Sequence, residues 1–265
     1  MKAAGTRGDK RLRVPVDELG NGERALGKEA AAYVARVHRL GEGDTFVAFD
    51  PERAIEGDAR IVAIGAGGRA VTVHVEAVRA AGVRAPRPVT LVQALGKGDK
   101  MDAIVRDATE LGATRIVPVI AERSVVRPED AAARAQRWRR IAVEAARQCG
   151  RGDVPRIDPP AELLAVLAAG SLASDEAEVG AGAWGVCLAP GASAALGDAL
   201  RAHDAGAAVT IVVGPEGGLS PAEIAACEAA GLASVGLGPL VLRTETVCAA
   251  VLGALLILAP GPRPE

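Results

Sequence analysis

The chain has 265 residues, of which 49% are hydrophobic, and its formal net charge at pH 7 is −2. This length suits one α/β domain or two small ones, and the hydrophobic fraction is ample for a buried core. The longest apolar run, residues 247–259, is too short to span a bilayer, and the charged start of the chain lacks a signal-peptide core. We therefore expect a cytoplasmic protein without a membrane segment.

Cysteine and histidine side chains are the usual ligands of transition metals. The candidates are Cys149, Cys187, Cys227, Cys248, His38, His74 and His203. The cysteines show no C-x-x-C spacing and the histidines do not cluster, so metal binding and disulfide chemistry are not expected. Each cysteine is instead predicted to be a small buried hydrophobic side chain.

From residue 11 to about residue 80, short apolar runs separated by Gly and Asp predict a small β-barrel. The runs are Arg11–Pro15, Thr45–Phe49, Ala59–Ile64 and Val71–Val75. A helix is expected from about Lys28 to Leu40, ending at Gly41. The stretch 80–88 contains two prolines and is the expected linker.

From residue 89 onward, predicted strands and helices alternate, which indicates a parallel α/β sheet. The expected strands are Val89–Gln93, Ile116–Ile120, Val186–Ala189 and Val209–Val213. Asp99 is expected to cap a helix that presents Met101, Ile104, Val105, Ala108 and Leu111 on one face.

A long helix is predicted from Glu129 to Arg151. Its apolar face carries Trp138, Ile141, Ala142, Ala145 and Cys149, and a second stripe carries Arg137, Arg140, Glu144, Gln148 and Arg151. A solvated face with an Arg140–Glu144 pair would explain the second stripe. The basic character of the run favours contact with RNA.

Two glycine-rich turns follow strands near the end of the chain. The segment 214–218 follows a strand and precedes a predicted capping box, with Ser220 as N-cap, Pro221 first and Glu223 third in a helix ending at Gly231. A second strand and turn, 234–238, precede Thr244, which is expected to cap a helix to about residue 259. Such turns let a ligand approach the backbone, but they also join strands to helices in any α/β protein.

The sequence does not support dinucleotide binding, ATP hydrolysis or esterase chemistry. The pattern Gly180-x-Gly182-x-x-Gly185 matches a dinucleotide fingerprint but precedes a predicted strand instead of following one. The sequence contains neither a G-x-x-x-x-G-K-[ST] phosphate loop nor a G-x-S-x-G nucleophile elbow.

As a set, the motifs resemble the RsmE family, the 16S rRNA (uracil-N3)-methyltransferases of the SPOUT superfamily. The segments that carry the resemblance are Lys97–Asp102, Glu110–Ala113, Pro118, Glu122–Ser124, Trp138, Glu144–Ala146, Gln148–Arg151, Gly214–Gly218, Glu223, Leu237–Gly238 and Leu242–Thr246. They cover nearly all of residues 89–258, and the N-terminal part resembles the family only loosely. The chain departs from the family at Leu240, where a basic residue is usual, at Arg147, where Glu is usual, and at Val247, where Ala is usual.

The resemblance implies a PUA-like RNA-binding β-barrel in residues 1–82 and a SPOUT methyltransferase domain in 83–265, with a parallel sheet and a C-terminal trefoil knot. It also implies a homodimer that binds S-adenosylmethionine and acts on 16S rRNA or the small ribosomal subunit. The residues implied to bind the cofactor are Leu188, Ala189, Gly214, Pro215, Glu216, Gly217, Gly218, Leu237, Gly238, Leu240, Val241, Leu242 and Thr244.

Methylating uracil N3 requires the loss of a weakly acidic proton, so the expected chemistry needs charge stabilisation. Arg243 or Arg123 would stabilise negative charge on the uracil oxygens, and Glu245 would orient the arginine or accept the proton. Alternatively, Arg243 and Glu245 form a pair that only braces the knot. The residues expected to contact RNA are Arg11, Arg13, Arg36, Arg39, Arg137, Arg140, Gln148 and Arg151.

Two other functions stay open from the sequence. A SPOUT methyltransferase with a different RNA target would keep the same cofactor motifs. A non-catalytic RNA-binding or ribosome-assembly factor would keep the fold, and cofactor binding would separate it from the enzymes.

Overall fold

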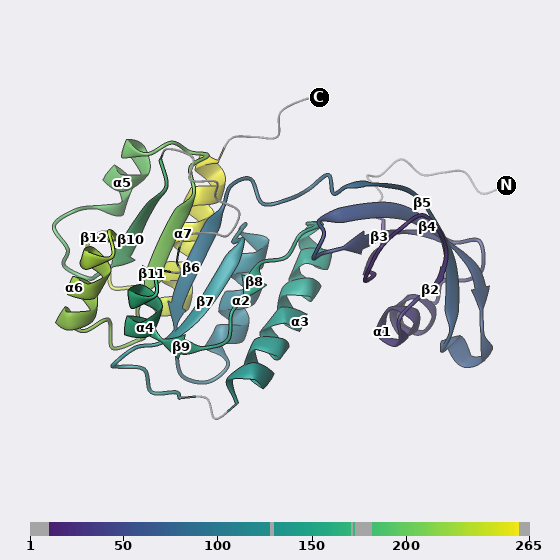
Figure 1. Ribbon diagram of the computed structural model, residues 1–265, viewed down its shortest axis with the longest axis horizontal. Coiled ribbons are helices and arrows are strands. Elements are labelled where there is room, and N and C mark those ends of the chain that lie inside the picture. Colours follow the sequence, from purple (N-terminus) through teal and green to yellow (C-terminus); the bar gives the residue numbers. More distant parts are fainter. Residues whose placement is uncertain (1–10, 128–129, 171, 173–181, 260–265) are drawn as a thin grey trace. The chain divides into compact units, whose positions relative to one another are not determined.

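The structure, a computed structural model, describes residues 11–127, 130–170, 172 and 182–259 (Figure 1). Contacts divide these residues into two compact units. The first unit contains residues 11–84 and 146–154, and the second contains residues 85–145 and 155–259.

Antiparallel strands dominate the first unit, as the short apolar runs predict. Its sheet has the order β1-β3-β4-β5-β2, in which only the β1–β3 pair is parallel. The strands are β1 (Arg13–Pro15), β2 (Gly22–Ala25), β3 (Thr45–Asp50), β4 (Ile55–Ile64) and β5 (Val71–Ala80). Val14, Phe46, Ile61 and Val73 lie in its buried core.

The helix expected from Lys28 to Leu40 is shorter and changes type. The α-helix α1 (Lys28–Ala32) continues as a π-helix, η1 (Tyr33–Val37), whose end is marked by a hydrogen bond from the amide of His38 to the carbonyl of Tyr33. A short 3₁₀-helix, η2 (Ala66–Gly68), joins β4 to β5.

A parallel sheet forms the centre of the second unit, as the alternation of strands and helices predicts. The strand order is β12-β10-β11-β6-β7-β8, and β9 also pairs with β7. The strands are β6 (Val89–Ala94), β7 (Arg115–Ile120), β8 (Arg156–Ile157), β9 (Ala161–Glu162), β10 (Trp184–Leu188), β11 (Val209–Val213) and β12 (Ala233–Val235). Every residue of β6 is buried, which explains why its sequence is apolar without alternation.

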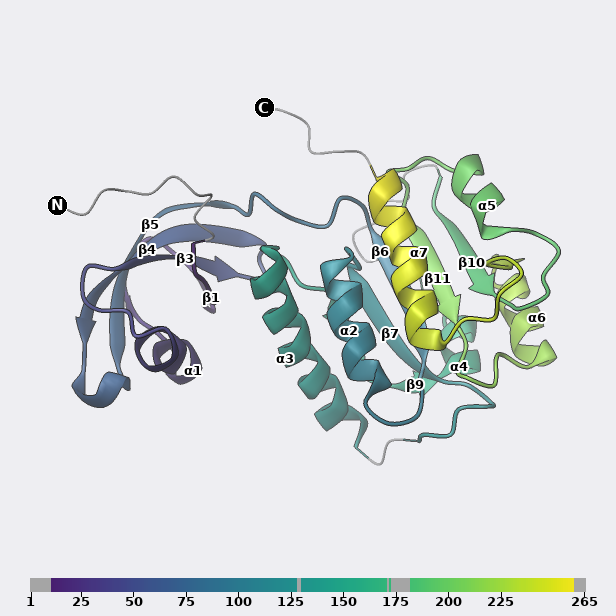
Figure 2. The ribbon, with the colours of Figure 1, turned by 180° about the vertical axis from the view of Figure 1, so that it is seen from behind.

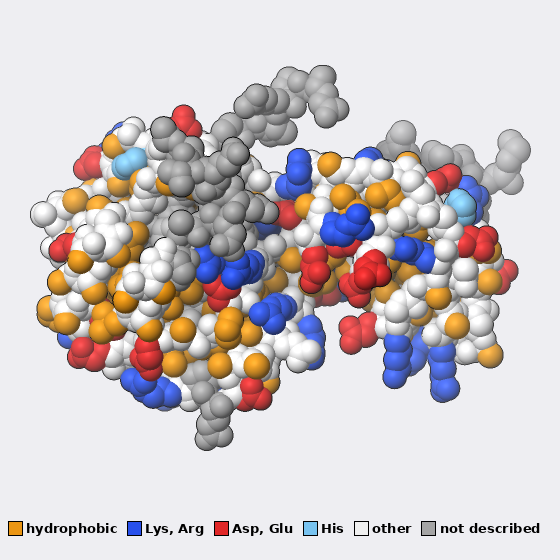
Figure 3. Space-filling model, viewed as in Figure 1, with side chains coloured by type: hydrophobic (Ala, Val, Ile, Leu, Met, Phe, Trp, Pro, Cys, Tyr) orange, Lys and Arg blue, Asp and Glu red, His pale blue; other side chains and the backbone are white. Residues whose placement is uncertain are grey.

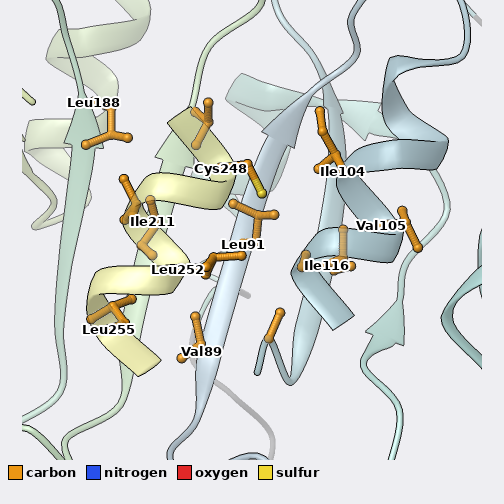
Figure 4. Close-up of a cluster of buried hydrophobic side chains, with 14 of the residues drawn as sticks. Val89, Leu91, Ile104, Val105, Ile116, Leu188, Ile211, Cys248, Leu252 and Leu255 are labelled. Carbon is orange, nitrogen blue, oxygen red and sulfur yellow. The ribbon is translucent and has the colours of Figure 1, made fainter. Parts of the chain in front are cut away.

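Helices cover both faces of this sheet (Figures 1 and 2). They are α2 (Lys100–Glu110), α3 (Ala131–Cys149), α4 (Leu163–Ala168), α5 (Leu196–Ala202), α6 (Pro221–Ala229) and α7 (Thr244–Leu258). Side chains of α2 and α7 share one core cluster with the sheet, while α4 and α6 contribute to the cluster on the other face. In Figure 4, Cys248, Leu252 and Leu255 of α7 lie beside Leu91 and Ile211 of the central strands.

Two predicted helix caps differ from the structure. Asp99 is the N-cap of α2, but its carboxylate makes no capping hydrogen bond and lies 3.8 Å from Arg137 instead. Thr244 is the first residue of α7 and Arg243 is its N-cap, because the Thr244 hydroxyl is bonded to other parts of the fold. The capping box of Ser220 and Glu223 is confirmed.

Two further expectations from the sequence can be compared with the structure. Cys149 is exposed, so the prediction that every cysteine is buried was wrong for this residue and correct for the other three. Gly185 lies inside β10, where an added Cβ would lie 2.3 Å from Leu232 Cδ2, so close packing explains this glycine. Gly180 and Glu129 lie outside the described residues.

In the part of the chain that the structure describes, no helix combines the length and apolar character needed to cross a bilayer.

Candidate functional site

A cavity of about 390 Å³ lies where β10, β11 and β12 end and α7 begins. Leu188, Val213 and Val235 are the last residues of these parallel strands, and all line it. Ligand sites in open α/β sheets lie at this carboxyl edge. The volume falls in the range of about 300–1,000 Å³ that small-molecule sites occupy.

Nearly all of the residues predicted to bind a cofactor meet at this cavity. The predicted residues that line it are Leu188, Ala189, Gly214, Pro215, Glu216, Gly218, Leu237, Gly238, Leu240, Val241, Leu242 and Thr244. They come from three separate loops, and the fold brings these loops together. Gly217 does not line the cavity.

Glycines give these loops backbone shapes that other residues rarely adopt. Gly218 has φ of 71° and Gly238 has φ of 124°, both in the region that favours glycine. A Cβ on Gly214 would lie 3.0 Å from the backbone nitrogen of Leu219. The loops can therefore turn tightly and present backbone groups to a ligand.

Gln93, Thr244 and Gly214 link the central strand to both sides of the cavity. The Gln93 side chain donates to Thr244 Oγ1 over 3.0 Å, and this hydroxyl donates to the carbonyl of Gly214 over 3.1 Å. Gln93 and Thr244 are buried. The first residue of α7 is thus fixed to the loop that follows β11, a contact that spacing along the sequence did not reveal.

Arg123, predicted as a catalytic alternative, does not line the cavity. Its Nη1 donates to the carbonyl of Gly217 over 2.9 Å. The adjacent amide of Glu122 donates to Glu223 Oε1 over 2.7 Å, and the other oxygen of Glu223 accepts from the amide of Ser220. The segment that follows β7 therefore holds the glycine loop 214–218 in place.

Arg243 lines the cavity, is exposed and forms no ion pair with a described residue. No ion pair within 4 Å joins these two described residues, Arg243 and Glu245, and Glu245 Oε2 instead lies 3.5 Å from Lys100 Nζ. The alternative in which Arg243 and Glu245 brace each other is therefore wrong. The same Lys100 Nζ lies 2.9 Å from Glu216 Oε1.

Sequence reasoning did not single out Lys100 as a site residue, although it belongs to the Lys97–Asp102 motif. The hydrogen bond to Glu216 raises the pKa of Lys100, and Glu245 adds to the effect. Burial acts to raise the pKa of Glu216, but the hydrogen bonds from Lys100 and from backbone amides outweigh burial and lower it. Lys100 and Glu216 are thus both charged at neutral pH.

Part of the apolar lining was not predicted. The additional lining residues are Pro190, Gly191, Val213, Val235, Pro239 and Val247. The ends of the predicted strands could have indicated Val213 and Val235. Val247, a departure from the family, is three residues after Thr244 and therefore comes back to the cavity after one helical turn.

The residues predicted to contact RNA have different environments. Arg13 is paired with Glu56, and the buried Arg151 is paired with Asp153, so both have structural roles in the first unit. Arg11 forms an ion pair with Asp58, and Arg137 forms one with Asp102. The side chains of Arg36, Arg39, Arg140 and Gln148 are exposed.

Figure 3 shows basic and acidic side chains intermixed on the visible face of the first unit. The first unit also contains ion pairs between partly exposed side chains, such as Arg79 with Asp58 at 3.2 Å. Arg147, another departure from the family, lies over the ring of Tyr33 with 3.7 Å between its guanidinium carbon and the ring centroid. This cation–π contact gives Arg147 a structural role in the first unit.

Comparison with known proteins adds independent evidence. Residues 83–256 match the family described as RNA methyltransferase domain. The chain is 33% identical to the ribosomal RNA small subunit methyltransferase E of Synechocystis sp. over 228 residues, which cover 84% of this chain and 70% of that protein. It is 39% identical to the protein of the same name from Mycobacterium bovis, over 64% of this chain.

A solved structure has the same fold. The ribosomal RNA small subunit methyltransferase E of Neisseria gonorrhoeae, bound to S-adenosyl methionine, matches with a TM-score of 0.80 and 28% identity over 94% of this chain and 98% of that chain. The match to the mycobacterial relative spans 63% of that relative's length. From the family match and the Synechocystis relative together, the chain belongs to the RsmE family of SPOUT RNA methyltransferases.

Proposed function

We propose that the protein transfers a methyl group from S-adenosylmethionine to N3 of a specific uridine in 16S rRNA. The observation that carries this proposal is the cavity at the carboxyl edge of the sheet, where glycine loops and Arg243 meet. Comparison with known proteins supports the proposal, because the chain is similar to ribosomal RNA small subunit methyltransferases E.

The residues present fit S-adenosylmethionine. Leu188, Val213, Val235 and Leu242 offer apolar surface for an adenine ring. The turns at Gly218 and Gly238 leave the backbone accessible to the polar groups of the ribose and the methionine portion. When bound, the cofactor supplies an electrophilic methyl group on a sulfonium.

The chain's own contribution would be placement and charge stabilisation. Arg243 lies at the cavity without a carboxylate partner among the described residues, so its guanidinium is available to an oxygen of the uracil ring. A cation at that place favours loss of the N3 proton because it stabilises the negative charge that develops on the ring. Glu245, two residues further, does not line the cavity. As the nearby carboxylate, it would accept the proton.

Arg123 is the less suitable candidate for this role. Its guanidinium is bonded to the carbonyl of Gly217, and it does not line the cavity. We therefore assign the charge-stabilising role to Arg243 and a bracing role to Arg123.

We extend the proposal to the finer features of the fold. A C-terminal trefoil knot is supported by the return of α7 to the sheet after the loop 236–243, which lines the same cavity as the loop 214–218. For the first unit we propose a PUA-like RNA-binding domain, on the basis of its mostly antiparallel sheet and the exposed Arg36 and Arg39. The proposed substrate is 16S rRNA or the small subunit, in the cytoplasm.

A homodimer is the proposed assembly. The end of α7 carries Leu256, Ile257 and Leu258 with 39%, 84% and 49% of their surfaces exposed, which leaves apolar area for a second copy. Sedimentation equilibrium over a wide concentration range checks this proposal. A mass that stays that of the monomer at every concentration would contradict it.

The direct test of the function uses purified protein, S-adenosylmethionine carrying a labelled methyl group, and small ribosomal subunits that lack 3-methyluridine. The proposal predicts label in 3-methyluridine of 16S rRNA. Label in a different nucleoside or RNA would support another target, and cofactor binding without transfer to any RNA would contradict the enzyme. Absence of cofactor binding would favour an RNA-binding or assembly factor.

A further inference from the structure

Lys100 is the first residue of α2, a position that by itself disfavours a positive charge. The N-terminus of a helix carries the positive end of the helix dipole, so a lysine there gains nothing from the helix itself. Its ammonium instead lies 2.9 Å from a carboxylate oxygen of Glu216 and 3.5 Å from one of Glu245. The contacts that account for Lys100 therefore lie outside its own helix.

Glu216 is the member of this group that lines the cavity, in the loop between β11 and α6. The amide of Lys97 donates to its Oε1 over 3.2 Å. A Cβ on Gly96 would lie 3.1 Å from the same oxygen, so the loop that precedes α2 closes tightly around the carboxylate. The tip of the cofactor loop is thus attached to the beginning of α2.

Glu245 belongs to the first turn of α7, next to Arg243. The side chains of Lys100 and Glu216 are 32% and 36% exposed, so solvent ions can screen this pair. The Glu245 side chain is 28% exposed, but the oxygen that faces Lys100 is buried. Glu245 forms an ion pair with Lys100 and none with Arg243 among the described residues. One ammonium therefore contacts both a loop of the cavity and the first turn of α7.

We propose that Lys100 is a positioning residue that holds the Glu216 loop and the first turn of α7 in the arrangement that binds the cofactor. It acts through Glu216 and Glu245 and does not touch the reacting atoms. This inference rests on the proposed function, because it takes the cavity to be the S-adenosylmethionine site.

The test measures the affinity of the purified protein for S-adenosylhomocysteine by isothermal titration calorimetry, without RNA and without turnover. Lys100→Met removes the charge and keeps an apolar stem, and we expect it to weaken binding by about threefold to tenfold. Lys100→Arg keeps the charge and should recover most of the affinity. Lys28→Met is the matched control, because Lys28 is also the first residue of a helix but has no ion pair with a described residue.

Salt dependence separates an electrostatic role from a general loss of structure. Exposed ion pairs are screened at high ionic strength, so the affinities of the wild-type protein and Lys100→Met should converge as salt is raised to about 1 M. A gap that is independent of salt would overturn the proposal. An affinity of Lys100→Met equal to that of the wild type at low salt would also overturn it, while leaving the proposed function intact.

A double-mutant cycle combines a Lys100 variant with Glu216→Gln. If Lys100→Met folds poorly, Lys100→Gln takes its place in the same cycle. If Lys100 acts in part through Glu216, the loss of affinity in the double variant should be smaller than the sum of the two single losses. Additive losses would overturn the proposal. A wild-type protein that does not bind S-adenosylhomocysteine would overturn the proposed function itself, and this inference with it.

Discussion

Thr244 donates a hydrogen bond of 3.1 Å to the carbonyl of Gly214, and this bond closes the cavity between the first turn of α7 and the glycine loop. The same hydroxyl accepts from the buried amide of Gln93. One side chain thus joins the central strand β6, the loop after β11 and the last helix.

Replacing Thr244 with valine keeps the shape of the side chain and removes the hydroxyl. The Gln93 amide and the Gly214 carbonyl would each lose a partner, so the free energy of unfolding should fall by about 1–3 kcal/mol. Urea denaturation measures this change. Thr246→Val on the exposed side of the same helix is the control and should change stability little.

Gly214→Ala tests whether the loop needs its close approach. The added Cβ would lie 3.0 Å from the backbone nitrogen of Leu219 and must displace the loop. Affinity for S-adenosylhomocysteine should fall by about tenfold, the cost expected for overpacking of this size. Gly253→Ala is the contrasting variant, because nothing lies within 4 Å of its Cβ in the middle of α7. Normal affinity in Gly214→Ala would show that the close approach does not matter.

The two arginines should be separable by kinetics. Arg243→Ala should lower kcat by roughly 100-fold while S-adenosylhomocysteine affinity and folding stay near normal, because one charge-stabilising group is removed. Arg123→Ala should instead weaken cofactor binding, since its guanidinium holds the carbonyl of Gly217. Near-normal turnover of a folded Arg243→Ala variant would remove Arg243 from the chemistry.

The four cysteines should react unequally with a thiol reagent. Cys149 is exposed, whereas Cys187, Cys227 and Cys248 are buried. Burial also raises the pKa of Cys248 to about 12, which keeps its thiol protonated and unreactive. Titration with an aromatic disulfide at pH 8 should modify one thiol rapidly in the folded protein and all four in denaturant. Rapid modification that persists in Cys149→Ser would contradict these environments.

Rules that depend on residues close in the sequence predicted individual elements of the fold, such as a buried strand and a helix cap. The buried strand Val209–Val213 has the predicted bounds, and the capping box of Ser220 and Glu223 forms as expected. Both depend on residues that are close in sequence. The convergence of the glycine loops at one cavity was also anticipated, because parallel strands end at the same edge of a sheet.

Contacts between distant segments could not be predicted in this way. Thr244 has the usual type of a capping residue, but a carbonyl thirty residues away takes its hydroxyl. Arg151 has the character of a surface cation in the sequence, but it is buried, and its carbonyl accepts a hydrogen bond from Arg13, 138 residues away. Lys100 meets Glu245 because α2 and α7 pack on the same face of the sheet. It meets Glu216 because the loop before α2 lies against the loop after β11.

The central claim is methylation of uridine N3 in 16S rRNA, and nucleoside mass spectrometry of small-subunit rRNA tests it most directly. Ribosomal RNA would be compared between a strain with the gene, a strain without it, and RNA from the second strain treated with purified protein and S-adenosylmethionine. The account predicts that 3-methyluridine disappears without the gene and returns after treatment. An unchanged level of 3-methyluridine in the strain without the gene would contradict it.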